Sequence, residues 1–153
     1  MNSQGIKNNY PENVGDIQFD SNIDDPNFKI CDPARCFQYY NFLKGFQYKG
    51  EKYQILELWN QTYKSELNSS KETGYITIRF LVNCEGKTGL FRIQQINGDY
   101  KETTFDNKLV TTIFNFVKNL NGWIIEENKG TKVDYYQYLS FKIENGIVKE
   151  ILP

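Results

Sequence analysis

The feature that most constrains the fold is a hairpin pattern at residues 74–93, GYITIRFLVNCEGKTGLFRI. Apolar side chains at every second position share one face of an extended strand. They are Ile76, Ile78, Phe80 and Val82. The segment CEGKTG then provides a turn, and LFRIQQI continues in the opposite direction. The pattern predicts an antiparallel hairpin that forms one wall of a hydrophobic core.

A second hairpin is predicted near the C-terminus. Residues 132–143 alternate again, and they are followed by Asn145-Gly146, a dipeptide that favours a two-residue hairpin turn. The segment IVKEIL at residues 147–152 is therefore expected to fold back onto the preceding strand.

Two segments have the apolar spacing of a helix, residues 51–67 and residues 104–120. The apolar stripe of the first is expected to consist of Tyr53, Leu56, Trp59 or Asn60, Tyr63 and Leu67. In the second, Thr103 or Thr104 is the expected N-cap, and an Asn-Gly pair ends the helix.

The resulting order is helix, strand, strand, helix, strand, strand. This order predicts an α+β fold in which two helices pack on one face of an antiparallel sheet. We divide the chain into an N-terminal tail and aromatic cap at residues 1–49 and the α+β domain at residues 50–153. Residues 33–49 carry six aromatic side chains, which are expected to cover part of the core.

Composition excludes several classes of function. The chain has no histidine, which removes the commonest general base, the commonest zinc ligand and every Ser-His or Cys-His nucleophile. Its net charge of −1 offers no electrostatic reason to expect nucleic acid as a partner. No apolar run approaches the roughly 20 residues of a membrane span. We therefore predict a protein that is not an enzyme and has no cofactor or metal.

Two short motifs resemble ligand sites but lack the residues that such sites require. The segment EGKTG resembles the end of a phosphate-binding loop, but Leu81 stands where that loop needs glycine, and a strand follows instead of a helix. The segment DSNIDD at residues 20–25 resembles the start of a calcium loop, but Asp25 replaces its glycine and Cys31 its final glutamate.

Three cysteines at positions 31, 36 and 84 allow one disulfide and one free thiol, in three ways. In an oxidising compartment we favour Cys31–Cys84 over Cys31–Cys36, because closing a long loop removes more entropy from the unfolded chain. That bond would also attach the N-terminal extension to the hairpin. Finding all three thiols free would remove this argument for an oxidising compartment.

Tyrosines supply the candidate binding residues. Tyr39, Tyr40, Tyr136 and Tyr138 would form a surface for a sugar or a peptide if they are exposed. The alternative, which we favour, is that they pack in the core or in the cap.

A family resemblance follows from the order of these features. The chain has a helix that opens with GEKYQILELW, a strand GYITIRFLVN led by glycine, and a helix FDNKLVTTIFNFVKNL. Trp123, a turn that contains Gly130 and a long strand that ends near Phe141 follow. Residues of about 50–144 thereby resemble the TonB C-terminal domain as it occurs in small envelope proteins. The chain departs from classical TonB in having only 4 prolines and no membrane span.

The resemblance implies a non-catalytic binding or scaffold module of the cell envelope, without the membrane anchor that energy transduction needs. It implies a periplasmic or outer-membrane-associated location, and a lipoprotein is one form of such a protein. The polar start of the chain fits either a native start or a mature sequence from which a signal peptide was removed. The implied partner is a protein or peptide that pairs with a sheet edge, but the predicted terminal hairpin would close the edge at residues 132–143. The alternative is an enzyme or a carbohydrate-binding protein whose site is not recognisable from the sequence.

Overall fold

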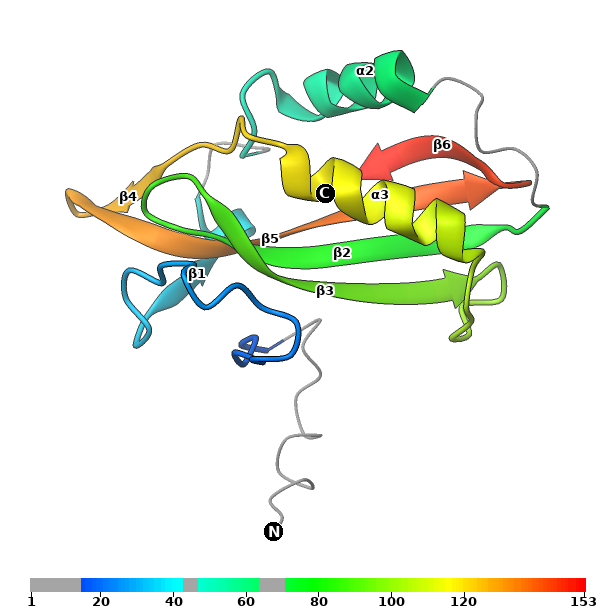
Figure 1. The fold of residues 1–153 in the computed structure, drawn as a ribbon. Coiled ribbons are helices and arrows are strands. Elements are labelled where there is room, and N and C mark those ends of the chain that lie inside the picture. Colours follow the sequence, from blue (N-terminus) through cyan, green and yellow to red (C-terminus); the bar gives the residue numbers. More distant parts are fainter. Residues whose placement is uncertain (1–14, 43–46, 64–70) are drawn as a thin grey trace, which may run out of the picture.

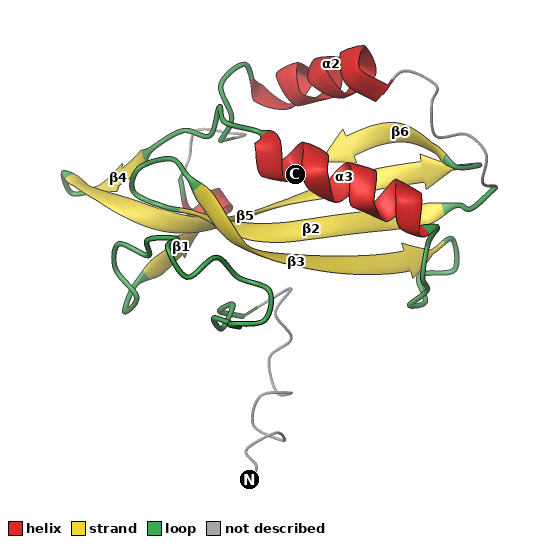
Figure 2. Cartoon of the chain, in the orientation of Figure 1, coloured by secondary structure: helices red, strands yellow, loops and turns green. Residues whose placement is uncertain are grey.

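The computed structural model describes residues 15–42, 47–63 and 71–153, which form two helices and a six-stranded mixed sheet (Figures 1 and 2). The helices are α2 (Glu51–Tyr63) and α3 (Asn107–Asn119), and a single 3-10 turn is η1 (Tyr39–Asn41). The strands are β1 (Cys36–Gln38), β2 (Gly74–Val82), β3 (Thr88–Asn97), β4 (Glu126–Asn128), β5 (Thr131–Glu144) and β6 (Ile147–Leu152). The predicted α+β class is thus correct.

The long strand β5 is the centre of the sheet. Strand β2 pairs antiparallel along one of its edges, and β3 pairs antiparallel with β2. The other edge of β5 is shared by β1, which pairs with residues 134–136, and by β6, which pairs with residues 140–144. Strand β1 runs parallel to β5, so the prediction of a purely antiparallel sheet is wrong. The sequence could not reveal β1, because a three-residue strand is too short to show an alternating pattern.

Both predicted hairpins are present. Strands β2 and β3 are joined by the turn that contains Gly86, and β5 and β6 are joined by Asn145-Gly146. The φ angles of Asn145 and Gly146 are 51° and 77°, which is the left-handed conformation that a two-residue hairpin turn requires at both positions. Strand β6 therefore lies along β5 as the dipeptide predicts.

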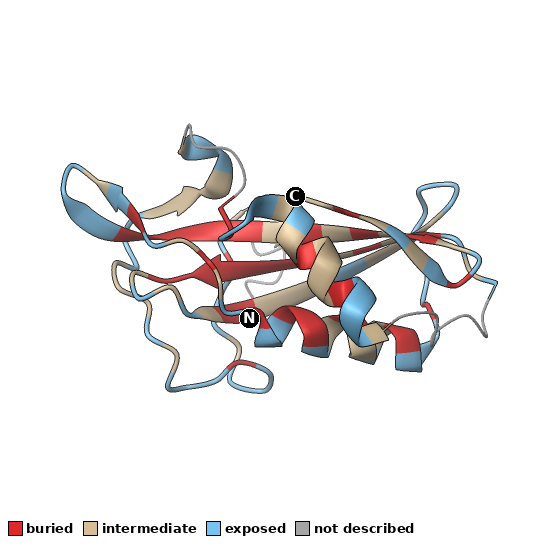
Figure 3. Cartoon of the chain, turned by 90° about the horizontal axis from the view of Figure 1, so that it is seen from above, coloured by how far each residue is buried: buried red, intermediate tan, exposed pale blue. Residues whose placement is uncertain are grey.

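Helices α2 and α3 cover the same face of the sheet (Figure 1). The four alternating residues of β2 are fully buried there, in one cluster with Leu109, Ile113 and Phe116 of α3. Trp123 also packs on this face, with its ring centroid 5.1 Å from that of Phe80. Figure 3 shows the buried positions along the central strands and on the helices. The predicted core is confirmed.

The helix boundaries differ from the sequence prediction in detail. The N-cap of α3 is Asp106, whose carboxylate accepts the Leu109 N–H at 3.2 Å, and not Thr103 or Thr104. The helix starts late because Phe105 is itself buried and its N–H donates to the side chain of Gln95 at 2.7 Å.

Helix α2 also differs from its expected pattern. Its buried residues are Ile55 and Trp59, and Tyr53 is 72% exposed. Trp59 is therefore buried as expected, whereas Ile55 is buried in place of Tyr53. Residues 64–67, which were expected to extend this helix, lie outside the described residues. Neither helix of the described chain is long and apolar enough to cross a membrane.

The N-terminal region packs on both faces of the sheet. Phe37 and Phe42 pack against the helix-side core, as expected for a cap, and Tyr39 contacts both that core and Tyr138 of the opposite face, whereas Phe46 lies outside the described residues. On the opposite face a smaller cluster joins the N-terminal segment to the strands. It consists of Ile17, Leu81, Leu90 and Tyr136, with Phe28, Ile30 and Cys36 packed against it.

Candidate functional site

The sheet face opposite the helices has two halves of different character. The covered half lies under residues 15–32 and is held by polar contacts and a disulfide (Figure 1). The other half, which we call the tyrosine half, has half-buried or exposed side chains. Its members are Tyr39, Tyr40, Tyr75, Thr77, Gln94, Tyr100, Tyr138 and Ser140.

Strand register builds the tyrosine half. Thr77 of β2 lies opposite Gln94 of β3 and Ser140 of β5, and the hydroxyl oxygens of Thr77 and Ser140 are 2.8 Å apart. Two residues before Thr77 on β2, Tyr75 lies opposite Ile96 of β3 and Lys142 of β5. Side chains of paired residues point to the same face, so these rows form a continuous surface.

A group of three tyrosines lies at one end of this surface. The ring of Tyr39 contacts that of Tyr138 edge-on at 5.6 Å and that of Tyr40 edge-on at 5.4 Å. Tyr40 is 62% exposed. Burial, together with a hydrogen bond to Tyr138, raises the pKa of Tyr39 to about 12, so its hydroxyl is neutral in ordinary buffers.

A tyrosine pair lies at the other end. The rings of Tyr75 and Tyr100 are stacked with centroids 6.2 Å apart and an angle of 16° between their planes. Tyr100 is 72% exposed. Tyr75 is four residues from Arg79, the partner of Tyr138, so the two groups are separated by roughly 13 Å along the strand.

Tyr136 does not belong to this surface, because it is packed under the N-terminal segment, which agrees with the favoured interpretation that these tyrosines pack. It is only 4% exposed, its hydroxyl accepts the Ile17 N–H at 3.0 Å, and the guanidinium of Arg79 lies 4.2 Å from its ring centroid. Burial raises its pKa to about 12. Alternation places Tyr136 and Tyr138 on one face, but the N-terminal segment covers only the first of them. Of the four predicted tyrosines, the structure brings together Tyr39, Tyr40 and Tyr138.

Two arginines, one buried and one half-buried, hold the N-terminal segment, and the sequence analysis missed both contacts. Arg79 is buried and donates to the Gly15 carbonyl and to the side-chain oxygen of Gln38, at 3.3 Å for the latter. Arg92 makes a two-pronged ion pair with Asp24, with N–O distances of 2.9 and 2.8 Å. This pair uses a carboxylate of the DSNIDD segment, which leaves that segment less suited to calcium. The only sequence signal for these contacts was an arginine at a strand position that faces away from the helix-side core.

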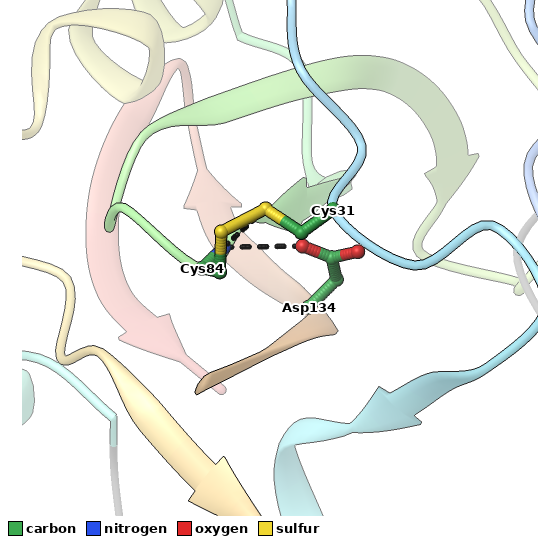
Figure 4. Close-up of side chains that lie close together, drawn as sticks. All are labelled: Cys31, Cys84 and Asp134. Atoms are coloured by element: carbon green, nitrogen blue, oxygen red, sulfur yellow. Dashed lines mark hydrogen bonds between the residues drawn. A yellow bond between two sulfur atoms is a disulfide. The ribbon is translucent and has the colours of Figure 1, made fainter. Parts of the chain in front are cut away.

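The disulfide Cys31–Cys84 joins the N-terminal segment to the β2–β3 turn (Figure 4). It is the pairing that the sequence analysis favours. Asp134 of β5 lies beside it and is fully buried; its carboxylate accepts the N–H of Cys84 at 3.1 Å and that of Asp32 at 2.8 Å.

Cys36 is the free thiol, and it is half-buried. Burial, and to a smaller extent the negative charges of Asp134 and Asp16, raise its pKa to about 12. Since the thiolate is the nucleophile, Cys36 is poorly suited to attack the neighbouring disulfide.

Comparisons with protein-family models, with curated proteins and with solved structures find no match. What is established is the α+β fold with a mixed, open sheet.

Proposed function

We propose that this chain is a non-catalytic binding or scaffold module of the cell envelope that resembles the TonB C-terminal domain. The proposal is supported by the order of α2, β2, β3, α3 and β5, with both helices on one sheet face and β5 beside β2. The order of these elements and the two helices on one sheet face are what the resemblance over residues of about 50–144 implies.

The disulfide supports the envelope location. A bond between Cys31 and Cys84 persists in oxidising compartments, and thiols are kept reduced in the cytosol. A periplasmic or outer-membrane-associated location, including that of a lipoprotein, fits this chemistry.

The observation that carries the binding role is the tyrosine half. Tyrosines provide large, rigid contact area with a polar end, which is why they are enriched in binding surfaces. By contrast, β1 and β6 occupy most of the outer edge of β5, so little of that edge can pair with an extended peptide. We therefore place the protein or peptide partner on the tyrosine half.

A carbohydrate is the second candidate ligand. The specific observation in its favour is that two tyrosine groups flank the paired hydroxyls of Thr77 and Ser140. Ring faces suit the apolar faces of sugars, and hydroxyl groups suit their polar edges. The enzyme alternative has no comparable observation behind it.

The test is capture of envelope components by the immobilised oxidised chain. A double variant, Tyr40→Ala with Tyr100→Ala, removes the exposed ring at each end of the tyrosine half. Tyr53→Ala is the matched control, because it removes an equally exposed tyrosine from α2 on the other side of the sheet. We expect capture to fall by about tenfold or more for the double variant, which corresponds to about 1.4 kcal/mol, and to be unchanged for the control.

Enzymatic digestion of the envelope extract before capture distinguishes the two kinds of ligand. If protease treatment of the extract abolishes capture, the partner is a protein or peptide; if glycan-degrading enzymes abolish it, the ligand is a carbohydrate. Equal capture by wild type and double variant would refute the assignment of binding to the tyrosine half.

A further inference from the structure

A cluster of sulfur and oxygen atoms lies where the N-terminal segment meets the sheet. The ligand atoms of Cys31, Cys84 and Asp134 all lie within 4.8 Å of one another (Figure 4). The two cysteines are held by segments that are 53 residues apart in sequence, and Asp134 comes from the central strand. We propose that these three residues bind a thiophilic divalent cation of the Zn²⁺ type when the disulfide is reduced.

The electrostatics of Asp134 point to a cation. Its carboxylate is fully buried, and within the described part of the chain no lysine or arginine forms an ion pair with it. Buried charges are ordinarily paired or coordinate a metal. Two backbone N–H groups stabilise this carboxylate, one on each oxygen, and each oxygen retains a lone pair for a further ligand bond.

The geometry suits a tetrahedral site with an open position. Zinc binds thiolate sulfur at about 2.3 Å and carboxylate oxygen at about 2.0–2.2 Å. Two sulfurs in such a site are roughly 3.8 Å apart, so the sulfurs must move apart from the 2.07 Å of the disulfide. Rotation of two side chains whose Cα atoms are 6.1 Å apart can supply this movement. Water would complete the coordination.

The conversion of the disulfide into the metal-bound site is balanced in electrons, protons and charge. A dithiol reductant supplies two electrons and two protons; the S–S bond breaks, both cysteines become thiols, and the reductant forms its own disulfide. The cation then replaces the two thiol protons, which leave to solvent. Two thiolates, one carboxylate and a divalent cation have a net charge of −1, compared with the −1 of Asp134 beside the disulfide.

The test is a Zn²⁺ titration of the full chain against a chromophoric chelator, after anaerobic reduction by a dithiol and its removal. We expect one Zn²⁺ per reduced chain, bound at least about 100-fold more tightly than by the oxidised chain. Cys31→Ser and Cys84→Ser should each lose about 100-fold or more, and Asp134→Asn about 10- to 100-fold. The matched control is Cys36→Ser, which removes a nearby thiol that the site does not use and should change affinity by less than about threefold.

A second measurement keeps the proposal falsifiable if a cysteine variant fails to fold. Co²⁺ bound to the reduced wild type should show thiolate-to-metal charge-transfer absorption, and Zn²⁺ should protect two of the three thiols from alkylation. Equal Zn²⁺ affinity of the oxidised and reduced chains would overturn the proposal. So would protection of Cys36 without protection of Cys31 and Cys84, or full binding by reduced Asp134→Asn.

Discussion

The two faces of the sheet are made by alternate residues of the same strands, yet they are held in different ways. On the helix face, α2 and α3 meet the strands through apolar and aromatic side chains, which form one continuous cluster. On the opposite face, the N-terminal segment is attached by a disulfide, by two arginines and by a small apolar cluster. Apolar burial is non-directional, whereas ion pairs and disulfides require particular partners. Because the helix-side cluster buries many more apolar side chains than the smaller cluster, we expect the first face to account for most of the stability. The second face determines which part of the sheet is covered and which remains open.

The largest expected effect is on the helix face. Phe80→Ala removes a fully buried ring that packs against Phe91 and Trp123. We expect a loss of about 3–5 kcal/mol in the free energy of unfolding, because the cavity adds to the lost transfer free energy. Urea unfolding at neutral pH measures it. A loss below about 1 kcal/mol would show that this face does not dominate stability.

Loss of the disulfide should have the next largest effect. We expect reduction, or Cys84→Ser, to lower the free energy of unfolding by about 2–4 kcal/mol, since the cross-link constrains the unfolded chain over a sequence separation of 53 residues. Cys36→Ser is the control and should leave the effect of reduction intact. An unchanged urea midpoint after reduction of the wild type would show that the disulfide does not stabilise the folded chain.

The ion pair of the covered half should have a smaller effect that depends on pH. Hydrogen bonding to Arg92 holds the pKa of Asp24 below its ordinary value, even though burial opposes this shift. The stabilisation is therefore fully present above the unfolded-state pKa of about 3.9 and is lost as pH falls through the lower folded-state pKa. At neutral pH, Asp24→Asn should cost about 1.5–3 kcal/mol.

The pH dependence provides the check on that pair. The difference in unfolding free energy between wild type and Asp24→Asn should be constant from about pH 5 to 8 and should shrink below about pH 4. Urea unfolding at several pH values measures it. A difference that persists unchanged at the acidic end would mean that Asp24 acts through packing and not through its charge.

The smallest effect is expected in the tyrosine half. Tyr40→Ala should change the free energy of unfolding by no more than about 0.5 kcal/mol, as should Tyr53→Ala on α2, because both rings are mostly exposed. Thermal unfolding of the wild type, Tyr40→Ala and Tyr53→Ala compares their stabilities. A large loss for Tyr40→Ala alone would assign that ring to the cap and weaken the case for a binding surface.

Much of the fold could be predicted because its patterns are local. Strands β2, β3, β5 and β6 were predicted from the alternation in residues 74–93 and 132–143 and from the Asn145-Gly146 turn. Helix α3 was predicted from its helical spacing of apolar residues. The candidate site was predicted less well. Tyr39, Tyr40 and Tyr138 do meet, but Tyr75 and Tyr100 were missed because their contact depends on the loop after β3.

By itself, the sequence determined the class of fold, the residues that β2 and α3 contribute to the helix-side core and, through the preference for a long loop, the favoured cysteine pair. These properties depend on periodicity and chain entropy, which can be evaluated without knowing where distant segments lie. Only the tertiary structure decided that β1 runs parallel to β5, that Tyr136 is covered and that Asp134 lies beside the disulfide. Each of these facts follows from the path of residues 15–38 across the sheet. That path is held by long-range contacts of Arg79, Arg92 and Cys84, and no local pattern encodes such contacts.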